Sequence, residues 1–179
     1  PNAARMYAIE VLKGSSQVQY GPFTTGGAIN MISTPIPQRL QAKLITSYGV
    51  YNTLKSHLMV GNSYQHVGFM VEYLRHQSKG FRHDIPDKRT GFQRNDLIAK
   101  VAVHTQEDAD LRQRLEFKFG FANEDSDETY LGLSETDFAT RPFYRYAGAQ
   151  KDNLTTRHFQ YVATHLLELP NKLKITTNL

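Results

Sequence analysis

Residues 111–122 read Leu-Arg-Gln-Arg-Leu-Glu-Phe-Lys-Phe-Gly-Phe-Ala, and this stretch decides the fold class. One set of alternate positions carries Leu111, Leu115 and three phenylalanines, with Gln113 as the exception. The positions between them carry arginine, glutamate and lysine before a glycine and an alanine. Because alternate residues of a β-strand point to opposite faces of its sheet, the stretch predicts a strand with one apolar face and one polar face.

The same alternation recurs along most of the chain. Proline lacks the backbone N–H and restrains the residue before it, so Pro35 and Pro37 interrupt any strand or helix and predict a linker over 35–39. After this linker we expect an all-β fold of seven antiparallel strands. The alternating segments are 40–44, 54–63, 66–77, 97–104, 111–122, 154–168 and 172–175.

The connections between these segments differ in length. Residues 107–110 and 170–171 form tight turns, whereas 78–94 and 123–153 are long. Unstructured loops of such length are uncommon and usually functional. Outer-membrane β-barrels have short periplasmic turns and long extracellular loops, so the alternation of short and long connections predicts part of a transmembrane antiparallel β-barrel.

The amino-acid composition excludes several classes of protein. The sequence contains no run approaching the roughly 20 apolar residues that a membrane-spanning helix requires, which excludes a helical membrane protein. Cysteine is absent, which excludes disulfides and cysteine-based metal sites. Lysine and arginine outnumber aspartate and glutamate by 21 to 17, but the basic residues are scattered, so we expect no nucleic-acid partner.

The first 36 residues differ from the rest. Two short apolar runs, 6–12 and 28–32, are separated by a stretch rich in Gly, Ser, Thr and Gln, and both runs predict short strands. The proline pair then marks a boundary near residue 37. We therefore expect one domain over residues 1–36 and a second over 37–179.

A motif in this first domain carries a family resemblance. The segments Ile9-Glu10-Val11-Leu12-Lys13-Gly14-Ser15-Ser16, Tyr20-Gly21-Pro22 and Gly26-Gly27-Ala28-Ile29-Asn30-Met31-Ile32-Ser33 resemble the closing part of the plug domain in TonB-dependent outer-membrane receptors. Glycines permit positive φ and close approach of the backbone, as the turns of a small plug require. We expect the motif residues Glu10, Lys13, Gly14, Gly21, Gly26, Gly27 and Asn30 to have structural roles.

The resemblance implies a fold and a function. It implies the C-terminal part of a plug followed by the first strands of a barrel that has roughly 22 strands in this family. It also implies energy-coupled import across the bacterial outer membrane, driven by the TonB protein through a segment upstream of this chain, which we expect to be a fragment. Residues 128–138 resemble a loop of receptors for ferric dicitrate and related iron chelates, which suggests ferric citrate or another siderophore as the ligand.

The long connections combine aromatic side chains with arginine. A guanidinium group suits the carboxylates of an anionic iron chelate, and this makes the connections candidates for ligand binding. An equally open interpretation is that the aromatic side chains form a belt beside the outer-membrane lipid and that the arginines face the phosphates of lipopolysaccharide. Tyr20 and Phe23 are candidates only because related plugs approach the ligand there. The other candidates are Arg82, His83, Arg94, Tyr144, Arg145 and Tyr146.

Other kinds of site find little support. The seven histidines do not form an His-x-x-x-His pattern, so we expect no metal site and no cofactor. No Ser-His-Asp order or pair of catalytic carboxylates can be assigned, so we expect no enzymatic activity. Two other functions remain open, a passive outer-membrane porin or adhesin and a soluble β-sandwich binding module. A sandwich would cover the face that carries Phe117 with a second sheet, whereas a membrane barrel would leave it exposed.

Overall fold

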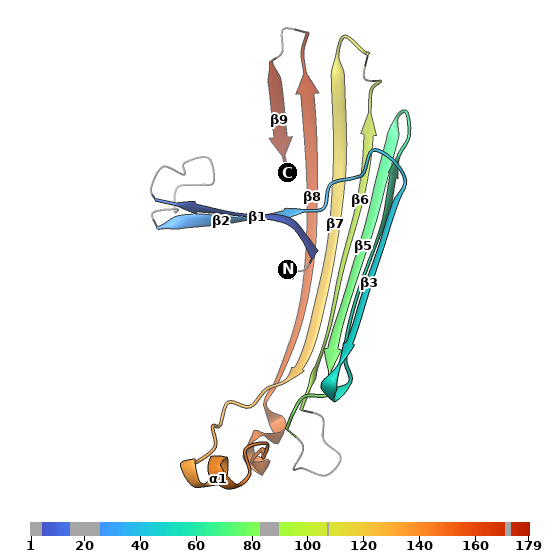
Figure 1. Ribbon diagram of the computed structural model, residues 1–179. Coiled ribbons are helices and arrows are strands. Elements are labelled where there is room, and N and C mark those ends of the chain that lie inside the picture. The colour runs from blue at the N-terminus through green and yellow to red at the C-terminus, as the bar shows by residue number, and fades with distance from the viewer. Residues whose placement is uncertain (1–4, 15–25, 83–89, 107, 171–172) are drawn as a thin grey trace. The chain divides into compact units, whose positions relative to one another are not determined.

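The computed structural model describes residues 5–14, 26–82, 90–106, 108–170 and 173–179. The chain divides into two compact units, Pro1–Pro35 and Ile36–Leu179. Both contain antiparallel sheets, so the expected all-β class is confirmed (Figure 1). In the described part of the chain, no helix has the length and apolar character needed to cross a membrane.

The first unit contains a β-hairpin of β1 (Met6–Lys13) and β2 (Gly27–Ser33). Glu10 lies directly opposite Asn30, and Asn30 Nδ2 donates a hydrogen bond to Glu10 Oε2 over 2.9 Å. Gly14 follows β1 with a φ of +100°, and Gly27 begins β2 with a φ of +136°. A Cβ at Gly27 would lie 2.6 Å from the carbonyl oxygen of Leu12, so both the conformation and the space require glycine there. The two strands expected in this region are therefore present.

The second unit is a single seven-stranded antiparallel sheet in which each strand pairs with its neighbours in sequence, and the expected seven strands are confirmed. The order runs from β3 at one edge to β9 at the other. The strands are β3 (Gln41–Gly49), β4 (Thr53–Ser63), β5 (Val67–Ser78), β6 (Phe92–His104), β7 (Arg112–Asp127), β8 (Asn153–Glu168) and β9 (Lys174–Asn178).

The connections are sorted between the two ends of this sheet. Residues 64–66, 105–111 and 169–173 join strands at one end and are short. The other end carries η3 (Val50–Asn52) and two longer connections, 79–91 and 128–152 (Figure 1). Connection 128–152 includes α1 (Glu135–Thr140) and η4 (Ala147–Lys151).

The two long connections are shorter than the sequence predicted. Strand β6 already begins at Phe92 and β7 continues to Asp127, so the predicted bounds of 78–94 and 123–153 were wrong by several residues. Backbone pairing continues here beyond the last apolar side chain, as in the pair Gln93 and Asp125. Apolar alternation therefore marks only the middle of these strands, not their full length.

The two faces of the sheet have opposite exposure. We call the face that carries Phe117 the apolar face and the other the charged face. Phe117 is 54% exposed and Tyr161 73%. On the charged face Met70 is fully buried and Glu72 is only 2% exposed. The sheet thus exposes much of its apolar face and buries charged residues such as Glu72, Asp96 and Lys100 on the other, the reverse of the arrangement in a water-soluble domain.

Ion pairs join several side chains of the charged face. His57 Nε2 lies 2.8 Å from Glu72 Oε1, and both side chains are buried. Lys100 Nζ lies 3.6 Å from Glu116 Oε1, and the other carboxylate oxygen of Glu116 is 2.9 Å from Arg114 Nη2. Burying a charge is costly unless it is paired and hydrogen-bonded, so these pairs make a buried charged face tolerable.

Residues 36 and 37 lie against the charged face at positions where its strands carry glycine. Ile36 is buried with Met59 and Met70, and the Ser63 hydroxyl donates a hydrogen bond to the carbonyl oxygen of Pro37 over 2.8 Å. A Cβ at Gly61 would lie 2.7 Å from Pro37 Cδ. Ile36 therefore belongs to the sheet unit, whereas the sequence placed the boundary one residue later.

This close approach predicts a stability difference between two glycines. Gly61→Ala should lower the free energy of unfolding by about 1–3 kcal/mol, because the added methyl group collides with Pro37 and the neighbouring backbone. Gly49→Ala is the matched control, because its Cβ would meet nothing closer than Thr53 Cβ at 4.0 Å. Urea unfolding of the intact protein, followed by circular dichroism, measures both. Equal effects would contradict the packing of residue 37 against β4.

Candidate functional site

Two adjacent rows of side chains cross the apolar face near its long-connection end. Residues directly opposite each other on neighbouring strands share a face, so the pairing register defines each row. Moving two residues along each strand changes every side chain from apolar to polar. The apolar row consists of Leu44, Leu58, Tyr73, Leu97, Phe121 and Phe159, and the polar row of Thr46, Ser56, Arg75, Asn95, Asn123 and Arg157.

Hydrogen bonds connect the two rows. The Tyr73 hydroxyl donates to Asn95 Oδ1 over 2.7 Å, and Asn95 Nδ2 donates to Asn123 Oδ1 over 3.1 Å. The rings of Phe121 and Phe159 lie 5.1 Å apart. Tyr73 thus has its ring in the apolar row and its hydroxyl bonded to the polar row. This orientation is typical of a tyrosine at a boundary between apolar and polar surroundings.

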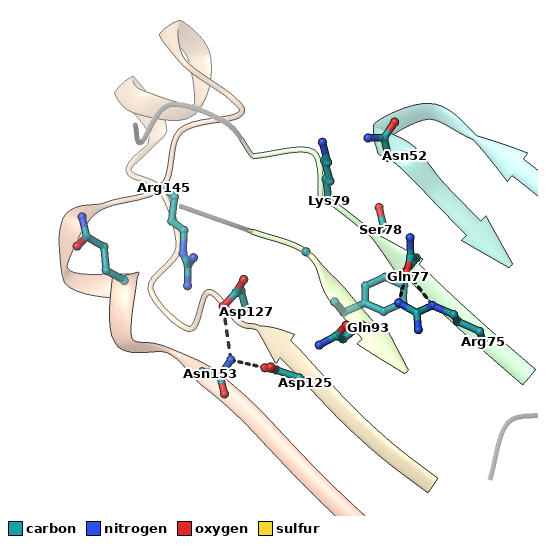
Figure 2. Close-up of a pocket in the computed structure, with 13 residues that line it drawn as sticks. Asn52, Arg75, Gln77, Ser78, Lys79, Gln93, Asp125, Asp127, Arg145 and Asn153 are labelled. Atoms are coloured by element: carbon teal, nitrogen blue, oxygen red, sulfur yellow. Dashed lines mark hydrogen bonds between the residues drawn. The ribbon is translucent and has the colours of Figure 1, made fainter. Parts of the chain in front are cut away.

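Beyond the polar row lies a cavity of about 700 Å³, within the range of ligand pockets (Figure 2). Among its strand residues, Arg75, Gln77, Gln93 and Asp125 lie at positions of the apolar face, whereas the paired residues Ser78 and Phe92 lie at positions of the charged face. Figure 2 shows Arg145 on connection 128–152, near Asp127. The remaining lining residues are Asn52, Lys79, Gly91, Asp127, Gln150 and Asn153.

The cavity is lined mainly by planar polar groups. Arg75 Nε and Nη2 donate to Gln77 Oε1 over 2.8 and 2.7 Å. Asn153 Nδ2 donates to Asp125 Oδ1 over 2.8 Å and to Asp127 Oδ1 over 3.4 Å. Amide, carboxylate and guanidinium groups offer donors and acceptors in fixed planes, so the cavity can bind a ligand that carries hydroxyl and anionic groups.

Arg145 is a predicted ligand residue that lines this cavity, but its guanidinium holds the backbone of connection 128–152. It is 2% exposed. Its Nη2 donates to the carbonyl oxygens of Glu128, Ala149 and Asp152, the last over 3.2 Å. A charged donor to buried carbonyls contributes more than a neutral one. Arg145 therefore fixes the shape of the connection at the cavity.

Tyr146 also acts within this connection. Its hydroxyl donates to Asp137 Oδ2, and the backbone N–H of Ser134 donates to the same hydroxyl over 3.1 Å. Ser134 Oγ accepts from the backbone N–H of Asp137 over 3.1 Å and caps α1, and Arg141 Nη2 donates to Asp137 Oδ1 over 2.9 Å. The hydroxyl of Tyr146, then Arg141 and Ser134, lower the pKa of Asp137 to about 2.

The two long connections meet through aromatic rings. The Phe81 and Phe143 rings lie 6.3 Å apart, and the Arg82 guanidinium is 5.6 Å from the centre of the Phe81 ring. Tyr144 packs 5.4 Å from Tyr146, with the Arg141 guanidinium 4.1 Å from the centre of the Tyr144 ring. The predicted residues Arg82, Tyr144 and Tyr146 are thus at the same end of the sheet.

Arg94 is not in a loop, as the sequence predicted, but in β6. It lies on the charged face, where Arg94 Nε donates to Glu124 Oε2 over 3.0 Å. The prediction was wrong because the polar ends of β6 and β7 show no apolar alternation although their backbones pair. The predicted residues Tyr20, Gly21, Phe23 and His83 lie outside the described residues.

Sequence reasoning missed the strand residues of the cavity. The signal was present along β7, where the positions of the apolar face change from Phe121 to Asn123 and Asp125. The same change occurs in β5 between Tyr73 and Arg75. Read separately, these polar residues suggest only the start of a loop, and the cross-strand register is needed to align them.

The site belongs to an antiparallel all-β protein with an exposed apolar face and a polar cavity at the end of that face. No protein-family model matches the chain, and no solved structure matches it. Among the described residues, no group of three or more His, Asp or Glu side chains is arranged to hold a metal ion.

The low pKa of Asp137 predicts acid sensitivity of α1. The folded pKa of about 2 lies below the ordinary value of 3.8, so the stabilisation is complete above about pH 4 and is lost as the pH falls towards 2. Hydrogen exchange of the α1 amides, corrected for intrinsic rates, should rise over that interval. Asp137→Asn should remove the pH dependence, and Glu135→Gln in the same turn should keep it. An unchanged profile in Asp137→Asn would contradict the assignment.

Proposed function

We propose that this chain is part of a bacterial outer-membrane β-barrel, with the apolar face against lipid and the charged face lining the interior. The exposure of the two faces carries this proposal. Water-exposed apolar area costs roughly 25 cal/mol per Å², and a patch that extends over several strands marks an interaction surface. Phe117 is 54% exposed where a β-sandwich would cover it, which favours lipid over a second sheet.

The boundary between the two rows supports the same proposal. On β5 the apolar face runs from Val67 to Tyr73 before the polar row begins at Arg75. This is about 20 Å along the strand at roughly 3.3 Å per residue, which spans about 15 Å of membrane at a strand tilt of about 40° and fits within the apolar band of about 25 Å in outer-membrane barrels. The aromatic residues and tyrosine hydroxyl of the apolar row then lie at the membrane interface.

The sheet edges fit the first strands of a larger barrel. Strands β3 and β9 are the edges of the described sheet. Backbone N–H and C=O groups in a bilayer must be paired, and antiparallel strands achieve this by closing a barrel. Further strands of the same protein would pair with these edges. The short connections then face the periplasm and the long ones the exterior.

We further propose that the barrel is a TonB-dependent receptor that imports an iron chelate, ferric citrate or another siderophore. The hairpin supports this because it places the residues of the plug-like motif in register, with Glu10 opposite Asn30 and Lys13 opposite Gly27. TonB would act through a segment upstream of this hairpin. The resemblance of residues 128–138 to a loop of receptors for ferric dicitrate and related iron chelates supports an iron chelate as the ligand.

The predicted ligand residues divide between two places under this proposal. Arg82, Tyr144 and Tyr146 belong to the outward connections and would meet the chelate first. Arg94 lies on the face that would line the interior, where it is paired with Glu124. A passive porin or adhesin would share the barrel but would not use TonB, so energy coupling separates these functions.

A matched pair of substitutions tests the membrane face. Phe117→Arg should cost roughly 2–4 kcal/mol in unfolding from lipid vesicles, because it places a charge well inside the apolar band. Asn123→Arg, on the same strand and face but in the polar row, should cost about 1 kcal/mol or less. Urea unfolding of the full-length protein in vesicles measures both. In a water-exposed sheet the two variants would differ little.

Uptake in whole cells tests the transport function. Cells that lack their own iron-chelate receptors and express the full-length protein should accumulate radiolabelled iron from ferric citrate or from another siderophore of a panel. Deleting TonB should abolish accumulation, because the plug would no longer be moved. Uptake that persists without TonB would indicate a passive porin and overturn the transport proposal.

A further inference from the structure

A notch on the charged face crosses β4 and β5 next to the start of the sheet unit. Gly61 and Gly68 belong to neighbouring cross-strand pairs, and each of the two strands contributes one of them. A Cβ at Gly61 would lie 2.7 Å from Pro37 Cδ, and a Cβ at Gly68 would lie 2.9 Å from Ile36 Cγ2. The notch therefore exists because both positions lack a side chain, and residues 36 and 37 fill it.

Two kinds of contact hold residues 36 and 37 in the notch. The Ile36 side chain is buried in a small apolar cluster, and the carbonyl oxygen of Pro37 accepts a hydrogen bond from the Ser63 hydroxyl over 2.8 Å. The other members of the cluster are Met59, Met70, Ile98 and Ala102. Pro35 on one side and Gln38 on the other are exposed. The contact is thus concentrated in two residues.

The segment that reaches the notch is stiff. Proline fixes its own φ and restrains the residue before it to extended conformations, so Pro35 and Pro37 leave residues 34–37 little freedom. A stiff segment transmits a pull to its next contact without first stretching. Strand β3 begins only at Gln41, so a pull that comes from the first unit reaches the notch before it reaches the strand ladder.

We propose that residues 36 and 37 form a mechanical clamp that fixes the chain to β4 and β5 while the first unit is pulled. The clamp bears the load and keeps it away from Gln41 and the register of β3. Residues before 36 can then move without disturbing the sheet. Its part in transport rests on the proposed pull by TonB, whereas the clamp itself depends only on contacts within the sheet unit.

One double variant makes the clamp switchable, because the chain contains no cysteine of its own. Ile36→Cys with Gly68→Cys places a sulfur at the γ position of residue 36, where Ile36 Cγ2 lies 2.9 Å from a Cβ at residue 68. The reduced variant lacks the apolar anchor, and a disulfide replaces that anchor in the oxidised variant. Uptake of ferric citrate by cells that express the full-length protein should be at least about threefold lower in the reduced state, at unchanged ligand binding. Oxidation should restore the wild-type rate.

The opposite dependence on oxidation would overturn the clamp. If residues 36 and 37 had to leave the notch during transport, the oxidised variant would be blocked and the reduced variant would import normally. Equal uptake in both states would also overturn it. Thr164→Cys with Asn178→Cys is the matched control, because these residues are opposite each other on the same face, with Thr164 Oγ1 2.9 Å from Asn178 Oδ1. The control should import equally in both states.

Force spectroscopy measures the clamp without transport. The full-length protein in lipid vesicles is pulled from its N-terminus, and the wild type should show a step of resistance before β3 yields. The reduced double variant should lack this step and release residues 36–40 together with the first unit, about 17 Å of additional chain at roughly 3.4 Å per residue. A wild-type trace without the step would overturn the clamp. A step in a wild-type protein that imports no chelate would reject the transport function alone.

Discussion

The residue-by-residue antiparallel register from β3 to β9 is the constraint on which the rest of the structure depends. Because each strand pairs with the next one in sequence, the face of every strand residue is set once one residue is placed. A shift by a single residue would turn Phe117 inward and Lys118 outward. The rows, the buried charges and the cavity all follow from this one register.

The alternation of residues 111–122, together with that of the six other alternating segments, was sufficient to predict the all-β class, the seven strands and their two faces. It was not sufficient for the strand ends, because Gln93 and Asp125 pair through the backbone without any apolar pattern. The same limit explains Arg94, whose partner Glu124 lies 30 residues away in sequence. The role of Arg145 was also beyond sequence reasoning, because it depends on three carbonyl groups that only the folded connection brings together.

The start of α1 did have a signal in the local sequence, which the polar composition of connection 128–152 obscured. Residues Ser134 to Asp137 have the spacing of a helix N-cap followed by an acid three residues later, and the cap forms as that spacing predicts. Asp137 also accepts from Tyr146 and Arg141, so one carboxylate links the start of α1 to the rest of the connection. Connection 128–152 is thus held by its own polar contacts.

The charged face and the apolar face of the sheet meet different physical requirements. The charged face must accommodate buried polar groups, and it does so with short cross-strand contacts such as that of His57 with Glu72 and with glycines that admit residues 36 and 37. The side chains of the apolar face change from apolar to polar within two residues of each strand, and six strands make that change in one row. A water-soluble sheet has no physical reason to align such a change across its strands. Under the proposed membrane orientation, the passage from the apolar band to the headgroup region would supply such a reason.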